Sequence, residues 1–171
     1  KYKRGKLARR NLTFYRINFN YFAPYRVLVD GTFIKACEDR KIDIKPRVEE
    51  WREANVYSVT FPLIYNFVYT LTDTTSCVVH ELANLGEALR PIYQASKRFQ
   101  KVKCKHEGTI DAHSCLYKIM GNTSFVSFRA HKFKEKFEDD ERYIMATNDK
   151  DLKFQLDQLV GVSNLIVQTI A

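Results

Sequence analysis

Short runs of β-branched and aromatic residues alternate along the chain with segments that have the apolar spacing of helices. The runs RVLVD, YIMAT and NLIVQT predict strands, and a further strand is predicted near Phe67–Leu71. Helical spacing is present in IKACEDRKI, TTSCVVHELANLG, Pro91–Phe99, HSCLYKIMG and DKDLKFQLDQLVG. Strands that alternate with helices predict an α/β fold with a central, mostly parallel sheet flanked by helices.

Glycines and charge runs set the expected boundaries of these elements. Gly86 and Gly121 each follow a helical pattern, as expected of the residue just past a helix end. Residues 122–141 mix charges of both signs without a period, and they predict a charged insertion, either a hairpin or a solvated loop. At 171 residues, the chain fits one compact domain.

Composition limits the class of protein. No apolar run approaches the roughly 18 residues of a membrane span, so a soluble protein with no membrane partner is expected. Because the sequence begins at Lys1 without an apolar leader, we expect a trimmed chain, and targeting signals in its flanks stay open. Four cysteines in a basic chain of this length fit reduced thiols or a metal site better than a disulfide scaffold.

The basic charge indicates a polyanionic partner. The chain has a net charge of +8, and the opening KYKRGKLARR has six basic residues in ten. Phosphate backbone is the first candidate, and a solvated basic leader is the alternative. The residues expected to contact phosphate are Lys3, Arg4, Lys6, Arg9 and Arg10.

Carboxylates follow the predicted strands at one edge of the sheet. They are Asp30, Glu81, Asp149 and Asp151. Clustered carboxylates repel each other unless a cation or hydrogen bonds compensate, and Mg²⁺ or Mn²⁺ prefers oxygen ligands. Each residue alone has a structural explanation as a helix cap or an exposed side chain, but their joint placement favours a cation site. A phosphatase of the aspartate-nucleophile type would require a second Asp where Thr32 stands.

The stretch VKCKHEGTIDAHSCLYKIMG places two cysteines and two histidines within a dozen residues. This density fits a metal site, a catalytic pocket or an accident of composition. Without a metal, these side chains are simply buried thiols and imidazoles. The spacing alone leaves the interpretations open.

Five motifs in the same order resemble the PIN-domain proteins of the small-subunit processome. They are RRNLTFYRINFNYFAPYRVLVDGTF, CVVHELANLG, CKHEGTIDAHSCL, YIMATNDKDL and GVSNLIVQT. The similarity covers roughly Lys6–Thr169, with Trp51–Tyr65 and Asn122–Glu141 poorly matched. Gly31 and Thr32 resemble the UTP twenty-three type of this family, since the sister FCF-one nuclease type would be expected to have Thr-Asn there.

The resemblance implies a PIN-like fold with an embedded CCHC zinc site. It places the zinc ligands at Cys77, Cys104, His106 and Cys115. His113 and His80 are rival fourth ligands because they lie close in sequence to Cys115 and Cys77. Closed sites of this composition contribute folding free energy rather than chemistry. Cys37 matches no ligand position and is expected in the core.

The resemblance also implies a nuclease site with one acidic position missing. Three of the four family positions are Asp30, Glu81 and Asp149, with Asp151 as a nearby supporter and His113 at the fourth. Asp111 lies two residues upstream of His113, about 200° around a helix, so it is not expected to replace the missing carboxylate. Losing one carboxylate weakens the binding of a second metal ion most.

The implied function is that of an RNA-binding ribosome-biogenesis factor with a degenerate nuclease site, acting in early pre-rRNA processing in the nucleolus. Its expected partners are pre-rRNA, a box H/ACA small nucleolar RNA (snoRNA) and small-subunit-processome proteins, and it is expected to be a monomer within that complex. An active metal-dependent endonuclease for single-stranded RNA is the alternative, and a protein-only scaffold is a third class. The expected organisation is a basic N-terminal arm at 1–22 and a PIN-like domain at 23–171, with the zinc site at 77–115 and the charged insertion at 122–141.

Overall fold

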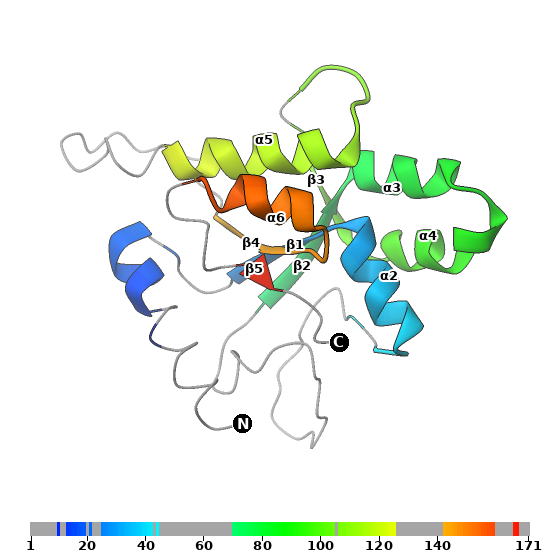
Figure 1. Cartoon of the computed structure of the whole chain (residues 1–171), viewed down its shortest axis with the longest axis horizontal. Coiled ribbons are helices and arrows are strands. Elements are labelled where there is room, and N and C mark those ends of the chain that lie inside the picture. Colours follow the sequence, from blue (N-terminus) through cyan, green and yellow to red (C-terminus); the bar gives the residue numbers. More distant parts are fainter. Residues whose placement is uncertain are drawn as a thin grey trace.

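The described strands form a single parallel sheet with helices packed around it (Figure 1). The computed structural model describes residues 10, 13–19, 21, 25–42, 44, 70–104, 106–125, 142–159 and 166–167. The strand order is β3-β2-β1-β4-β5, and every pairing in it is parallel. The strands are β1 (Tyr25–Val29), β2 (Thr70–Thr75), β3 (Gln100–Val102), β4 (Tyr143–Ala146) and β5 (Ile166–Val167). The predicted parallel α/β architecture is confirmed.

Helices follow the strands and cover the sheet. They are α2 (Gly31–Asp39), α3 (Ser76–Asn84), the 3-10 helix η1 (Glu87–Leu89), α4 (Arg90–Ser96), α5 (Ala112–Phe125) and α6 (Lys150–Leu156). Helix α2 packs on α4, α5 packs on α6, and α3 contacts both α4 and α5. Residues 13–19 are also helical and lie at the left of the view in Figure 1.

Three strands are followed by helices that begin at a polar capping residue, directly after β1 and β2 and three residues after β4. The Asp30 side chain accepts a hydrogen bond from Phe33 N at the start of α2, and Thr75 accepts one from Val78 N at the start of α3. Asp149 does the same for the first turn of α6. These caps satisfy backbone N–H groups that have no partner within the helix. The carboxyl edge of the sheet is therefore lined by helix N-termini.

The core explains why the central strand reads as an unbroken apolar run. Val27, Leu28 and Val29 of β1 are at most 1% exposed, because helices cover both faces of a parallel sheet. Helices α2 and α5 supply the largest side chains around this strand. The fully buried residues among them are Phe33, Ile34, Leu116, Ile119 and Met120.

Two sequence predictions about element boundaries were wrong. The strand predicted near Phe67–Leu71 continues beyond Leu71 to Thr75, because Thr72 and Asp73 pair with Val27 and Leu28 of β1. Residues 67–69 lie outside the described residues. Helix α5 does not stop at Gly121 but continues to Phe125, four residues into the expected insertion. An interior glycine costs a helix only about 1 kcal/mol, and α5 is held by its packing on α6. Gly86, in contrast, follows α3 with φ of 87°, as predicted.

The first described residues pack on the sheet through aromatic rings. Tyr15, Tyr21 and Tyr25 form a buried cluster against which Phe19 and Ile144 pack. The Tyr21 hydroxyl also donates a hydrogen bond of 3.3 Å to a β4 carbonyl. The basic residues 1–9 lie outside the described residues, as do 126–141 of the insertion. The division of the chain at residue 22 therefore stays a prediction.

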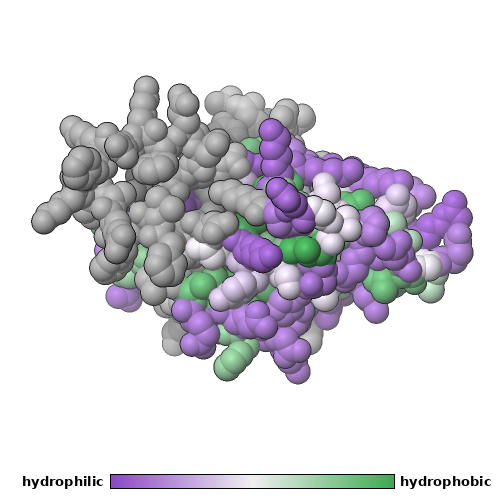
Figure 2. Space-filling model, turned by 90° about the horizontal axis from the view of Figure 1, so that it is seen from above, coloured by the Kyte–Doolittle hydropathy of each residue, from purple (hydrophilic) through white to green (hydrophobic). Residues whose placement is uncertain are grey.

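The described part of the face in Figure 2 is mainly hydrophilic. Seen from above in Figure 2, hydrophobic side chains form small, separate areas among polar ones. The large hydrophobic side chains exposed in the described ranges are Phe14, Ile17, Leu85 and Phe154. Over these ranges no helix has the length and apolar character to cross a membrane.

An ion pair ties the first two strands of the chain together inside the sheet. Arg26 Nε of β1 lies 2.7 Å from Asp73 Oδ2 of β2, with side-chain exposures of 17% and 1%. The guanidinium carbon of Arg26 lies 5.0 Å from the ring centroid of Tyr143 on β4. Arg26 thus contacts side chains of both neighbouring strands.

Replacing Arg26 by alanine should lower the free energy of unfolding by about 3 kcal/mol, because the buried Asp73 carboxylate loses its guanidinium partner. The double variant Arg26→Met with Asp73→Leu should recover most of this loss, since it removes both charges. Urea denaturation measures both effects. A loss of less than about 1 kcal/mol for the single variant would contradict this role for the pair.

Candidate metal centre and acidic edge

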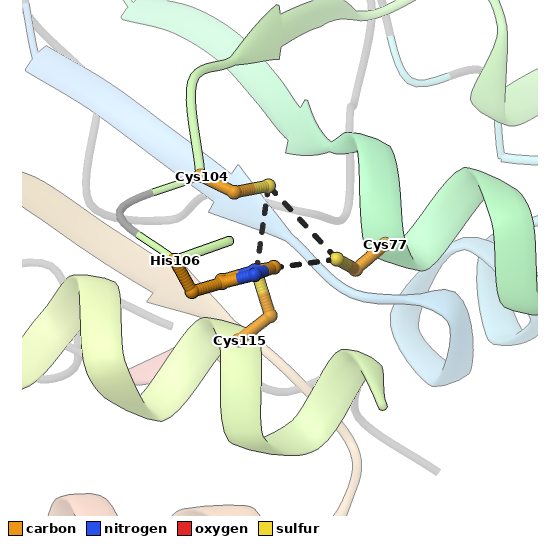
Figure 3. Close-up of side chains that lie close together, drawn as sticks. All are labelled: Cys77, Cys104, His106 and Cys115. Atoms are coloured by element: carbon orange, nitrogen blue, oxygen red, sulfur yellow. Dashed lines mark hydrogen bonds between the residues drawn. The ribbon is translucent and has the colours of Figure 1, made fainter. Parts of the chain in front are cut away.

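Four side chains from three parts of the chain meet beside the sheet (Figure 3). Cys77 is in the first turn of α3, and Cys104 and His106 follow β3. Cys115 is in the first turns of α5 and points back at them. Their ligand atoms all lie within 4.8 Å of one another. We call these four residues the Cys/His group.

The distances within the Cys/His group match the edges of a tetrahedral zinc site. Zn–S bonds of 2.3 Å and Zn–N bonds near 2.05 Å give tetrahedral edges of about 3.8 Å between two sulfurs and about 3.5 Å between sulfur and nitrogen. Cys104 Sγ lies 4.0 Å from Cys77 Sγ and 3.6 Å from Cys115 Sγ. His106 Nε2 lies 3.4 Å from Cys77 Sγ and 3.2 Å from Cys115 Sγ. Sulfurs this far apart are thiols, not disulfides.

Burial disfavours the thiolate form of these cysteines unless a cation is bound. Burial and the neighbouring Cys104 thiol raise the pKa of Cys115, and the Thr75 hydroxyl lowers it only in part. Three thiols and one imidazole nitrogen therefore face each other with little to stabilise a thiolate. His106 Nδ1 is buried and has no hydrogen-bond partner within the described part of the chain. A divalent cation would favour the thiolates and take the Nε2 lone pair.

The rival fourth ligands lie outside the Cys/His group. His80 is exposed on α3, where its Nδ1 lies 3.3 Å from Asn84 Nδ2. His113 Nδ1 lies 3.5 Å from Asp149 Oδ2 at the carboxyl edge of the sheet. The geometry therefore favours Cys77 as the fourth ligand. Cys37 is fully buried in the core, where burial raises the pKa of its thiol to about 11.

Asp30 occupies the centre of the carboxyl edge and is 4% exposed. Its Oδ1 accepts from Phe33 N at 2.7 Å, and its Oδ2 accepts from the hydroxyls of Thr32 at 2.8 Å and Thr147 at 2.5 Å. Burial raises the pKa of the Asp30 carboxyl, the three hydrogen bonds lower it, and the charge of Asp149 raises it further. Asp30 is thus a largely satisfied, buried acid.

Asp149 and Glu81 also accept hydrogen bonds from helix N-termini. Asp149 Oδ1 accepts from Asp151 N at 2.8 Å and from Leu152 N at 3.2 Å. Glu81 Oε2 reaches across from α3 to accept from Ala112 N at 3.0 Å, at the first residue of α5. Asp151 is exposed on the first turn of α6.

Asp111 also accepts a hydrogen bond from the first turn of a helix, α5. Its Oδ2 accepts from Ser114 N at 2.7 Å, and this bond holds the pKa of Asp111 below its usual range. The side chain is exposed at the start of α5. The expectation that Asp111 does not supply the missing carboxylate stays a prediction.

Three carboxylates do not converge on one point in the described structure. Within the described residues, the ligand atoms of the Cys/His group all lie within 4.8 Å of one another. The carboxylate oxygens of Asp30, Glu81 and Asp149 do not gather that closely. Asp30 and Asp149 are near enough for their charges to interact, while Glu81 is held at the N-terminus of α5. The role of these carboxylates in binding Mg²⁺ or Mn²⁺ stays a prediction.

Sequence reasoning missed the two threonines that hold Asp30. Thr147 bridges the acidic edge, because its hydroxyl donates to Asp30 and accepts from Asp149 N at 2.9 Å. Thr32 likewise donates to Asp30 and accepts from Asn148 N at 3.1 Å. The signal was present as a Thr within two positions of each Asp, in DGT and TND. Pairing them required knowing that β1 and β4 are neighbours.

The predicted phosphate contacts fall mostly outside the described residues. Arg10 is described and exposed, whereas Lys3, Arg4, Lys6 and Arg9 lie outside the described ranges. Their role stays a prediction.

Comparison with known proteins identifies relatives over most of the chain. The Fcf1 family model matches residues 70–170. The rRNA-processing protein fcf1 of Schizosaccharomyces pombe is 30% identical over 173 residues, which cover 96% of this chain and 73% of that protein. The rRNA-processing protein utp23 of the same yeast is 24% identical over 94% of this chain, which spans 52% of that protein. The human rRNA-processing protein FCF1 homolog is 29% identical over 87% of this chain and 60% of its own length.

A solved structure supports the fold. The PIN domain endonuclease Utp24 aligns with a TM-score of 0.54 and 26% sequence identity, covering 86% of this chain and 94% of that one. The chain therefore has a PIN-like α/β fold, and the resemblance stated from the sequence motifs is confirmed. Both types of that family are among the relatives. The assignment to the UTP twenty-three type, made on Gly31 and Thr32, stays a prediction.

We expect one zinc ion per chain, and alanine at Cys115 should abolish its binding. Cys37→Ala is the matched control, because both thiols are fully buried but only Cys115 is in the Cys/His group. Cys37→Ala should keep zinc and lose about 1 kcal/mol, whereas Cys115→Ala should lose at least about 3 kcal/mol. Mass spectrometry of the metal and urea denaturation measure these effects. Equal losses with no zinc in either protein would indicate buried thiols without a metal.

Asn in place of Asp30 should stabilise the protein at neutral pH. An acid whose pKa is raised by folding binds more protons in the folded state, so stability falls as the pH rises from the ordinary carboxyl pKa to the raised one. Asn keeps the cap oxygen for Phe33 N and removes the buried charge. The midpoint of thermal unfolding should rise by a few degrees at pH 7 and converge with the wild type in acid.

Asp111→Asn is the control for this effect. The pKa of Asp111 is shifted in the opposite direction, so its replacement should not raise the unfolding midpoint at pH 7. A lower midpoint for Asp30→Asn at pH 7 would contradict the inferred cost of the buried carboxylate.

Proposed function

Because the chain belongs to the Fcf1 family and has a PIN-like fold, we propose that it is an RNA-binding ribosome-biogenesis factor of the small-subunit processome. The rRNA-processing names of its relatives support this role. The proposal includes early pre-rRNA processing in the nucleolus, binding to pre-rRNA and a box H/ACA snoRNA, and a monomeric state within the complex. The chain spans 73% of the fcf1 protein and 52% of utp23, and the proposal concerns the part that it represents.

One observation supports a degenerate nuclease site more than any other. His113, at the position where the family has its fourth acidic residue, lies 3.5 Å from Asp149 Oδ2. An imidazole there removes one negative charge from the edge that would have to attract cations. Asp30 and Asp149 already accept hydrogen bonds from helix N-termini, and Asp30 also accepts from the Thr147 hydroxyl. The balance favours an assembly role over phosphodiester cleavage.

We propose structural zinc for the Cys/His group. Zinc in such a closed site supplies folding free energy, and no water position is left for chemistry. The four residues join α3, the segment after β3 and α5. They would hold the N-terminus of α5 against α3, which is also where Glu81 accepts from Ala112 N.

A metal-dependent endonuclease for single-stranded RNA is the second candidate. Its support is the closeness of Asp30 to Asp149 at the carboxyl edge and the likeness to the PIN domain endonuclease Utp24. Mg²⁺ or Mn²⁺ would be its cofactor. This candidate requires Glu81 to leave Ala112 N or a cation to bind at fewer carboxylates.

Asp30→Asn separates the two candidates. In cells in which it replaces the wild-type protein, pre-rRNA cleavage should continue, whereas depletion of the protein should block it. The purified wild-type protein should not cut single-stranded RNA in Mn²⁺. Cutting that Asp30→Asn abolishes would establish the endonuclease instead.

His113→Asp provides a gain-of-function test, with Mn²⁺ affinity as the measurement. It adds a carboxylate next to Asp149 and should bind Mn²⁺ about tenfold more tightly than the wild type. His113→Asn is the neutral control and should bind Mn²⁺ as the wild type does. Unchanged Mn²⁺ affinity for His113→Asp would remove the argument that His113 marks a lost acidic position.

A further inference from the structure

The positive charge of this protein is concentrated at one end of the chain. Residues 1–29 contain eight Lys and Arg and no Asp or Glu, so they account for the whole net charge of +8. The remaining 142 residues contain twenty basic and twenty acidic side chains. Arg26 is paired with Asp73, so the other seven basic side chains of this segment supply the positive charge that attracts a polyanion.

The helical segment 13–19 lies at this end and has two different faces. Tyr15 is 3% exposed and Phe19 is partly buried, and both belong to the tyrosine cluster at the sheet. Phe14 and Ile17, three residues apart, leave much of their surface to solvent, with 52% and 68% exposed.

Phe14 is an exposed ring that packs on two less exposed aromatic rings. Its ring centroid lies 5.5 Å from that of Tyr15 in an edge-on arrangement and 6.0 Å from that of Phe19. Packing on these anchored rings limits its movement, so little conformational entropy is lost when a flat ligand covers it.

We infer that Phe14, with Ile17 beside it, is a base-stacking site for single-stranded RNA. The inference rests on the proposed RNA-binding function and gives it a substrate class, a single strand with unpaired bases. Arg10 and Arg16 are both exposed, and they belong to the segment 1–29, whose sequence contains no Asp or Glu. Aromatic side chains beside basic ones are the combination that binds single strands, because bases stack on the rings while cations hold the phosphates.

The charge favours RNA over a protein as the occupant of this face. An acidic protein with an apolar surface would also be attracted to this face. Its binding, however, would not require an aromatic ring at position 14. Bases in a duplex are stacked on each other and cannot cover Phe14, so a single strand is the form of RNA that fits.

The test uses the full chain and fluorescently labelled single-stranded oligouridine. Phe14→Ala should weaken binding about tenfold, within the roughly 5- to 150-fold range of one lost base stack. The slope of affinity against salt should stay unchanged because no phosphate contact is lost. Arg10→Ala, in contrast, should reduce that slope by about 0.7. Phe14→Trp should keep the affinity, and oligouridine should quench its fluorescence.

Two further variants keep the test decisive. Phe154→Ala removes a ring that is 70% exposed on α6 and should bind oligouridine as the wild type does. Phe14→Leu keeps an apolar side chain for packing but lacks the ring, and it should weaken binding as Phe14→Ala does. Circular dichroism confirms that the variants are folded.

The alternative outcomes overturn either the proposed RNA-binding function or the stacking site. If the wild type binds neither oligouridine nor duplex RNA, both the proposed RNA-binding function and this inference are wrong. If the wild type binds and Phe14→Ala matches it, only the stacking site is wrong, and a protein partner at this face becomes the better explanation. An equal loss of duplex and single-strand binding in Phe14→Ala would also overturn the stacking site.

Discussion

The passage of parallel strands into capped helices is the constraint on which this structure depends. Three strands are followed within three residues by a helix whose first turn donates to a polar cap, and two of the caps are Asp30 and Asp149. The same carboxylates are the candidates for binding a cation. Each lone pair committed to a helix N-terminus is unavailable to a metal ion, so the fold and an acidic site compete for the same oxygens.

The sequence predicted much of the fold because β1 and β4 are largely buried and the helices are periodic. YIMAT and RVLVD could be located because burial on both faces requires apolar runs. Strand β3 was missed because Gln100–Val102 is a short, largely exposed edge with little hydrophobic signal. Helix α5 was predicted too short because packing on α6 outweighs the cost of Gly121. Long-range packing, which a local pattern does not record, decided both cases.

The candidate site was predicted as a set of residues but not as a set of contacts. The Cys/His group came from a family resemblance, and its four members do meet. The acidic residues were placed correctly after their strands, yet Glu81 is occupied at the N-terminus of α5 and Asp30 is enclosed by threonine hydroxyls. Such partners depend on which strands are neighbours, and the order β2-β1-β4 cannot be read from the chain order alone.

The helices that carry the sulfurs also carry the residues of the acidic edge. Cys77 and Glu81 share α3, and His113 and Cys115 share the first turns of α5. A covalent change at the thiols, such as oxidation, would therefore act on the two helices that hold Glu81 and His113, and His113 Nδ1 lies 3.5 Å from Asp149 Oδ2. The redox state of those sulfurs and the acidic edge are thus linked through α3 and α5.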